Sequence, residues 1–129
     1  MSAHDPSRPT RRVLIVEDEV LISMLLEDML ADLGYAVAAT ASRVEEAVKL
    51  ARELEIDAAV LDVNVNGQEV YPVAEALAAR DIPFVFATGY GERGLPDAYK
   101  KRPTLQKPFQ QETLEQKLVE LFGKSGEKS

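Results

Sequence analysis

The chain has 129 residues and 46% hydrophobic residues, which suits one compact domain with a buried core. Cysteine is absent and the single histidine, His4, lies in a polar segment, so disulfides, thiolate metal sites and histidine-based catalytic triads are excluded. The net charge of −7 argues against binding to nucleic acid or an anionic membrane surface, and no stretch approaches the roughly 20 apolar residues of a membrane span. We therefore expect a soluble, cytoplasmic protein.

Both ends of the chain are polar. Residues 1–11 are rich in Pro, Ser and Arg, and residues 123–129 read GKSGEKS. Such compositions bury too little apolar surface to order a chain, so we expect disordered tails flanking one domain over residues 12–122.

The first part of the domain alternates strand and helix patterns. Residues 13–16 form a short continuous apolar run, as expected of a strand covered on both faces. From 20 to 33 apolar residues recur at helical spacing, and Gly34 follows as a stop signal. Residues 35–39 then read as a second strand.

The middle of the domain repeats the alternation. Ser42 and Glu45 have the spacing of a capping box, which predicts that a helix opens there. A third strand is expected over residues 58–63, and a helix over about 69–79 tolerates Pro72 because that residue lies in its first turn.

The last third contains one irregular unit. A fourth strand is expected over 83–88, a short fifth over 104–106, and a final helix over 111–122 with Gly123 as its stop. Between the fourth and fifth strands the chain reads GYGERGLPDAYKKRP, and its glycines and prolines predict a loop with at most one or two helical turns.

Alternating strands and helices indicate a parallel sheet with right-handed crossovers. Five such units in about 110 residues fit an α/β fold of the flavodoxin-like, doubly wound type, with strand order 2-1-3-4-5 and a fourth helix that is shortened or absent.

Polar residues stand where the expected strands end. Glu17 and Asp18 follow the first strand, Asp62 ends the third, Thr88 ends the fourth, and Lys107 follows the fifth. Each has an ordinary reading too: Asp18 as a helix cap, Asp62 as a turn residue, Thr88 as a strand residue and Lys107 as a solvated side chain. Parallel strands bring their carboxyl ends to one rim, where ligands of such folds bind, and this favours a shared site.

The residue types suggest phosphoryl chemistry. Carboxylate oxygens of Glu17, Asp18 and Asp62 suit Mg²⁺, and an aspartate is a competent nucleophile toward phosphorus. Lys107 would neutralise charge on the transferring oxygens, and Thr88 would donate a hydrogen bond to them.

These motifs resemble those of the receiver domain of two-component response regulators, over residues 13 to about 122. The resemblance implies Mg²⁺-dependent phosphorylation of Asp62 by a histidine kinase or phosphotransfer protein, a metal contact from the backbone carbonyl of Asn64, and a cis peptide before Pro108. It also implies a single-domain regulator that acts by protein–protein contact, as a monomer or weak homodimer, without nucleic acid or membrane. Residues 86–90, reading FATGY, are similar to the signature of the FATGUY group. The family usually has Tyr or Phe two residues before the lysine, where this chain has Leu105, so we expect Thr88, Tyr90 and the Gly-rich loop to carry the conformational change instead of an aromatic flip.

Two alternatives remain open. An aspartate-nucleophile phosphatase of the haloacid dehalogenase type would need a second acid at position 64, where this chain has Asn64. A receiver that only binds partners would not need to keep Asp62, Thr88 and Lys107 together.

Overall fold

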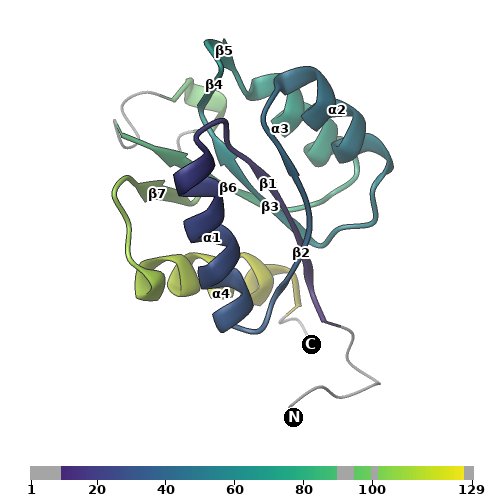
Figure 1. Ribbon diagram of the computed structural model, residues 1–129. Helices are drawn as coiled ribbons and strands as arrows, with labels where there is room; N and C mark the ends of the chain where they lie inside the picture. The colour runs from purple at the N-terminus through teal and green to yellow at the C-terminus, as the bar shows by residue number, and fades with distance from the viewer. Residues whose placement is uncertain (1–9, 90–94, 100–101, 127–129) are drawn as a thin grey trace.

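The computed structural model describes residues 10–89, 95–99 and 102–126, with side chains described to residue 123. A five-stranded parallel sheet forms its centre (Figure 1). Its spatial order is β2-β1-β3-β6-β7. The short strands β4 and β5 form a separate sheet, so β6 and β7 are the fourth and fifth strands of the main sheet and the expected 2-1-3-4-5 order is confirmed. The five strands are β1 (Arg12–Val16), β2 (Ala36–Ala41), β3 (Ala58–Asp62), β6 (Phe84–Thr88) and β7 (Thr104–Gln106).

Four helices cover the two faces of the sheet, α1 and α4 on one side and α2 and α3 on the other (Figure 1). They are α1 (Val20–Asp32), α2 (Val44–Glu53), α3 (Tyr71–Ala79) and α4 (Gln111–Gly126). The apolar runs of β1, β3 and β6 are buried because each of these strands is covered on both faces. Within the described residues, none of the helices combines the length and apolar character that crossing a membrane requires.

Helix α1 ends as the sequence predicts. Gly34 has a φ of +92°, in the region that glycine adopts at little cost. The Gly34 N–H donates to the carbonyl of Ala31, and the Tyr35 N–H donates to the carbonyl of Leu30. This pair of bonds satisfies the last carbonyls of the helix and turns the chain into β2.

Two boundary predictions are wrong. Helix α2 begins at Val44 with Arg43 as its N-cap and without a side-chain capping bond, so Ser42 and Glu45 do not form a capping box. Arg43 is extended (φ −138°, ψ 150°), and the helix starts one residue too late for Ser42 to reach it. Helix α4 continues past Gly123 to Gly126, because that glycine lacks a positive φ and no proline follows it.

A hairpin that sequence reasoning did not predict follows β3. It consists of β4 (Asn64–Val65) and β5 (Gln68–Glu69), paired antiparallel around Asn66 and Gly67. Both turn residues have positive φ, 52° and 82°, which is typical of an Asn-Gly hairpin turn. The hairpin fixes the chain directly after Asp62.

The connection between β6 and β7 lacks an α-helix in its described part, which contains one 3-10 turn over Asp97–Tyr99. Tyr99 stacks on Tyr71 of α3 at 5.4 Å between ring centroids, and it also packs edge-on against Phe84 and Phe86. These rings attach the connection to the α3 side of the sheet. Tyr90, which we expect to take part in a switch, lies outside the described residues.

Candidate functional site

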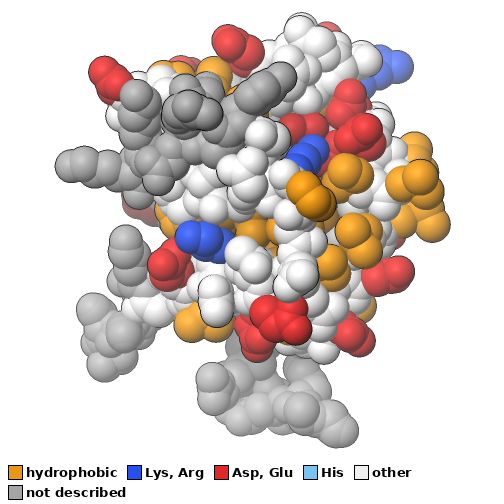
Figure 2. Space-filling view, turned by 90° about the vertical axis from the view of Figure 1, so that its left-hand side faces the viewer, with side chains coloured by type: hydrophobic (Ala, Val, Ile, Leu, Met, Phe, Trp, Pro, Cys, Tyr) orange, Lys and Arg blue, Asp and Glu red, His pale blue; other side chains and the backbone are white. Residues whose placement is uncertain are grey.

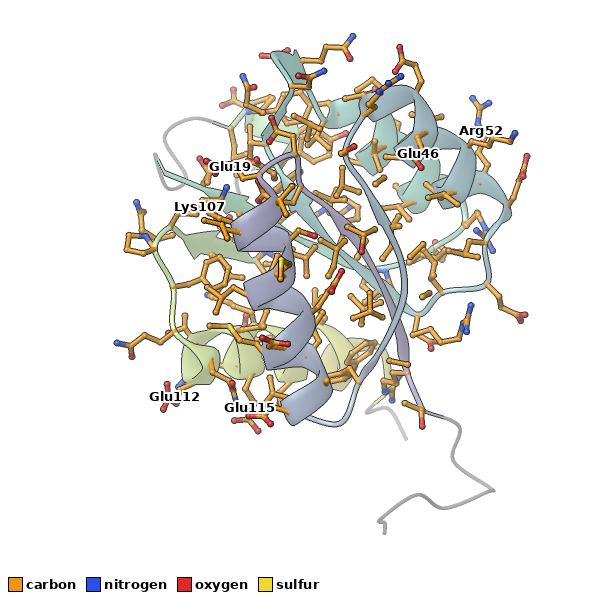
Figure 3. All side chains as sticks on the ribbon, viewed as in Figure 1. Glu19, Glu46, Arg52, Lys107, Glu112 and Glu115 are labelled. Carbon is orange, nitrogen blue, oxygen red and sulfur yellow. The ribbon has the colours of Figure 1, made fainter. Side chains whose placement is uncertain are left out.

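Four of the polar residues selected from the sequence meet at the carboxyl ends of the strands. Glu17 directly follows β1, Asp62 ends β3, Thr88 ends β6, and Lys107 directly follows β7. Glu17, Asp62 and Thr88 are 2%, 8% and 4% exposed. Figure 3 shows Lys107 beside the first turn of α1, at the same end of the sheet as Glu19. The rim predicted from topology is thus present in the fold.

Lys107 connects two of the acids. Its Nζ lies 3.0 Å from Oε1 of Glu17 and 3.4 Å from Oδ2 of Asp62. Its backbone N–H donates to the carbonyl of Thr88, which fixes the end of β7 against the end of β6. The peptide bond from Lys107 to Pro108 is cis, as the resemblance implies.

The electrostatics show how buried acids are tolerated here. Burial raises the pKa of Glu17 to about 7, although bonds from the Glu19 backbone and from Lys107 oppose the rise. Burial likewise raises the pKa of Asp62, against the opposing charge of Lys107. Burial alone would lower the pKa of Lys107, but the adjacent Glu17 and Asp62 outweigh it and the pKa is raised. Part of the negative charge is therefore neutralised by the lysine and part by a proton.

Asp18 is not a helix cap. The N-cap of α1 is Glu19, which makes no side-chain capping bond, and Oδ2 of Asp18 instead accepts a 2.8 Å hydrogen bond from the N–H of Asn66. This bond joins the end of β1 to the hairpin turn. An oxygen of Asp18 lies within 4.8 Å of one of Asp62, and Asp18 is not the N-cap of α1, so the capping alternative is wrong.

The three carboxylates can bind a divalent cation. Glu17, Asp18 and Asp62 each place an oxygen within 4.8 Å of the others. These ligands are all oxygen atoms, and at least one negative charge remains after compensation by Lys107 and a proton. Such a set fits a hard ion such as Mg²⁺ better than a soft one. Asn64 lies in β4, with its N–H 3.4 Å from Oδ1 of Asp62, so its backbone borders the same group.

Sequence reasoning missed the surface beside this site. Leu21 and Leu25 belong to the apolar residues that recur at helical spacing over 20–33, yet they are 80% and 46% exposed, and Val20 and Met24 are 69% and 53% exposed. We call these four residues the α1 apolar patch. The buried stripe of the helix is Ser23, Leu26 and Leu30. The available signal was that α1 has more apolar residues than one stripe can bury.

Comparisons with known proteins agree with this geometry. A family model described as the response regulator receiver domain matches residues 13–119. The solution structure of SdrG from Sphingomonas melonis Fr1 is 46% identical and superposes with a TM-score of 0.79, covering 88% of this chain and 97% of that one. The solution structure of the BeF3-activated conformation of SdrG from Pseudomonas melonis Fr1 is 49% identical, with a TM-score of 0.73 over 84% of this chain and 92% of that one.

A curated relative is the transcriptional regulatory protein PdtaR from Mycobacterium tuberculosis, 36% identical over 103 residues, which are 77% of this chain and 50% of PdtaR. The chain thus spans about half the length of this relative.

Proposed function

The chain belongs to the response regulator receiver domain family, and we propose that its Asp62 accepts a phosphoryl group from a histidine kinase or a histidine phosphotransfer protein. The supporting observation is the arrangement of Asp62 itself: it is nearly buried, lies 3.4 Å from the Lys107 ammonium and shares a carboxylate cluster with Glu17 and Asp18. The family match favours this signalling role over the phosphatase alternative.

The residues suit the transfer in distinct ways. A carboxylate oxygen of Asp62 forms the new bond to phosphorus as the donor's P–N bond breaks, and the released imidazole nitrogen keeps its electron pair. Lys107 stabilises negative charge on the phosphoryl oxygens, and Thr88, which ends the neighbouring strand β6, donates its hydroxyl to one of them in this proposal. Mg²⁺ held by Glu17, Asp18, Asp62 and the Asn64 carbonyl would supply further charge stabilisation when bound.

The proposed donor is a protein. The α1 apolar patch borders the acidic rim, and Figure 2 shows hydrophobic side chains gathered beside acidic and basic ones on that face. A small phosphoryl donor has no use for such a surface, whereas a protein partner gains binding free energy by covering it.

The response to phosphorylation is proposed to start at Thr88. Its carbonyl accepts the Lys107 N–H, and the carbonyl of Gly89 accepts a 3.0 Å bond from the Gln106 side chain. A hydroxyl drawn toward a phosphoryl group on Asp62 therefore pulls on the start of the β6–β7 connection. The resemblance of residues 86–90 to the FATGUY signature supports the same segment, and the beryllofluoride-activated state of SdrG supports the view that such a chain has a distinct activated conformation.

The direct test is Asp62→Asn. With phosphoramidate and Mg²⁺, intact-mass spectrometry should show one phosphoryl adduct on the parent and none on the variant, because an amide oxygen is a poor nucleophile. Asp81→Asn, at an exposed position whose φ of 59° suits asparagine, is the matched control and should label like the parent. Equal labelling of Asp62→Asn would show that another residue is the acceptor.

A further inference from the structure

A second cavity lies next to the phosphoacceptor site, between α1 and β2. Its volume is about 240 Å³, and it shares Glu17 and Asp18 with the carboxylate cluster. From there it extends to Glu27 and Met24 on α1 and to Thr40 on β2. A single water has a share of about 30 Å³ in the liquid, so the cavity has room for a larger polar group.

The polar lining consists of acceptors and hydroxyls. Oε2 of Glu27 accepts a 3.1 Å hydrogen bond from the Thr40 hydroxyl, which fixes the carboxylate at the β2 side of the cavity. Ser23 lines the same space and is 7% exposed, so its hydroxyl adds a polar group to the cavity wall.

The cavity also has an apolar wall. Val20 and Met24 both line it and both belong to the α1 apolar patch, so the patch continues into the cavity. A lining that combines carboxylates with exposed apolar side chains fits a group with a cationic head and an alkyl stem. Lysine and arginine side chains have this form.

We propose that this cavity receives a lysine or arginine side chain of the protein that phosphorylates Asp62. The inference rests on the proposed function, because a donor that brings its phosphohistidine to Asp62 must also cover the neighbouring cavity. Charge complementarity supports a basic group: the chain carries a net charge of −7, and Glu27 adds a carboxylate that the phosphoryl site does not use. The cationic head would bond to Glu27 and Ser23 while its stem packs on Met24.

Glu27→Gln tests the proposal, since it removes the charge but keeps an oxygen for Thr40. Asp28→Asn is the matched control, because it removes one charge from the next residue of α1, at an exposed position outside the cavity lining. The probe is the purified phosphorylated kinase that transfers fastest to the parent in a panel of histidine kinases from the same genome. We expect kcat/KM for transfer to Glu27→Gln to fall roughly tenfold, while Asp28→Asn changes it less than twofold.

Phosphoramidate supplies the second arm, because this small donor makes no use of a docking cavity. Loss of transfer from the kinase with labelling by phosphoramidate retained supports the proposal. Equal kinase transfer to Glu27→Gln and the parent, or equal losses in Glu27→Gln and Asp28→Asn, would overturn it and leave the phosphoacceptor role intact. Failure of phosphoramidate to label Asp62 in the parent would instead count against the proposed function.

A charge swap guards against a variant that misfolds. Glu27→Lys should block transfer, and replacing a single kinase lysine or arginine by glutamate should restore it if the two side chains meet. Failure of every such single replacement to restore transfer would overturn the pairing. Titration calorimetry with Mg²⁺ alone tests whether the cavity binds a metal ion instead. If the parent binds two equivalents of Mg²⁺ and Glu27→Gln binds only one, the cavity is a cation site and the docking proposal is overturned.

Discussion

Removing the charge of Asp18 should stabilise the metal-free protein. Oxygens of Asp18, Asp62 and Glu17 lie within 4.8 Å of one another, so their charges repel when no cation lies between them. At 4.8 Å two unit charges interact with about 1 kcal/mol at the dielectric of water and about 3.5 kcal/mol at an effective dielectric of 20. Because Asp18 is the most open of the three and Lys107 lies nearby, the lower figure applies. We expect Asp18→Asn to gain about 1 kcal/mol of unfolding free energy.

The choice of asparagine is essential to this experiment. Its side-chain oxygen can still accept the hydrogen bond from the Asn66 N–H that Asp18 accepts at 2.8 Å. Asp18→Ala removes charge and acceptor together, and a hydrogen bond is worth about 1 kcal/mol, so its two effects should nearly cancel. The expected order of metal-free stability is Asp18→Asn above parent, with Asp18→Ala close to parent.

Thermal melting followed by circular dichroism, with chelator and with Mg²⁺, measures both halves of the effect. For a domain of this size about 1 kcal/mol corresponds to a Tm change of about 4 °C. Mg²⁺ should raise the Tm of the parent and raise that of Asp18→Asn much less, because binding stabilises only the state that binds. Asp28→Asn controls for the change in net charge. A metal-free Asp18→Asn that melts below the parent would refute the repulsion argument.

Two further predictions concern the proton and the loop. Because the pKa of Glu17 is raised to about 7, Mg²⁺ has to displace a proton below that pH. Calorimetry should therefore show the Mg²⁺ affinity falling as the pH drops from about 8 to 6, by up to about tenfold per pH unit. Glu17→Gln should bind Mg²⁺ more weakly and lose most of this pH dependence. Beryllofluoride with Mg²⁺ should change hydrogen exchange in residues 89–102, since the Thr88 and Gly89 carbonyls are tied to Lys107 and Gln106. Exchange changes confined to α4 would contradict the loop prediction.

The position of the site could be predicted from sequence because topology determines it. Once β1, β3 and β6 are recognised as buried parallel strands, Glu17, Asp62 and Thr88 must lie at one rim, whatever the details of packing. The position of Lys107 was harder to predict, because β7 has only three residues. Lys107 lies at the rim because the preceding residue, Gln106, pairs with Thr88 at the end of β6. The proximity of these groups is confirmed by the contacts of Lys107 with both acids.

What sequence could not predict are features that depend on which neighbours an element has. The periodicity of α1 defines an apolar helix, but only the three-dimensional packing shows that β1 and α4 leave Leu21 and Leu25 uncovered. The capping spacing of Ser42 and Glu45 is local, whereas the helix begins at Val44, which packs in the core. The partner of Asp18 is 48 residues away in a hairpin whose strands have two residues each, too short for a periodic signal.

Three interactions compensate the negative charge of the cluster formed by Glu17, Asp18 and Asp62. Lys107 pairs with Glu17 and Asp62, and the Asn66 N–H bonds to Asp18. The raised pKa of Glu17 means that the folded metal-free protein keeps a proton between pH 4.5 and about 7 that the unfolded chain has lost. Stability of the metal-free state therefore falls as pH rises through that window. A bound divalent cation would take over the role of that proton, so the same cluster can be stable when empty and open to a metal near neutral pH.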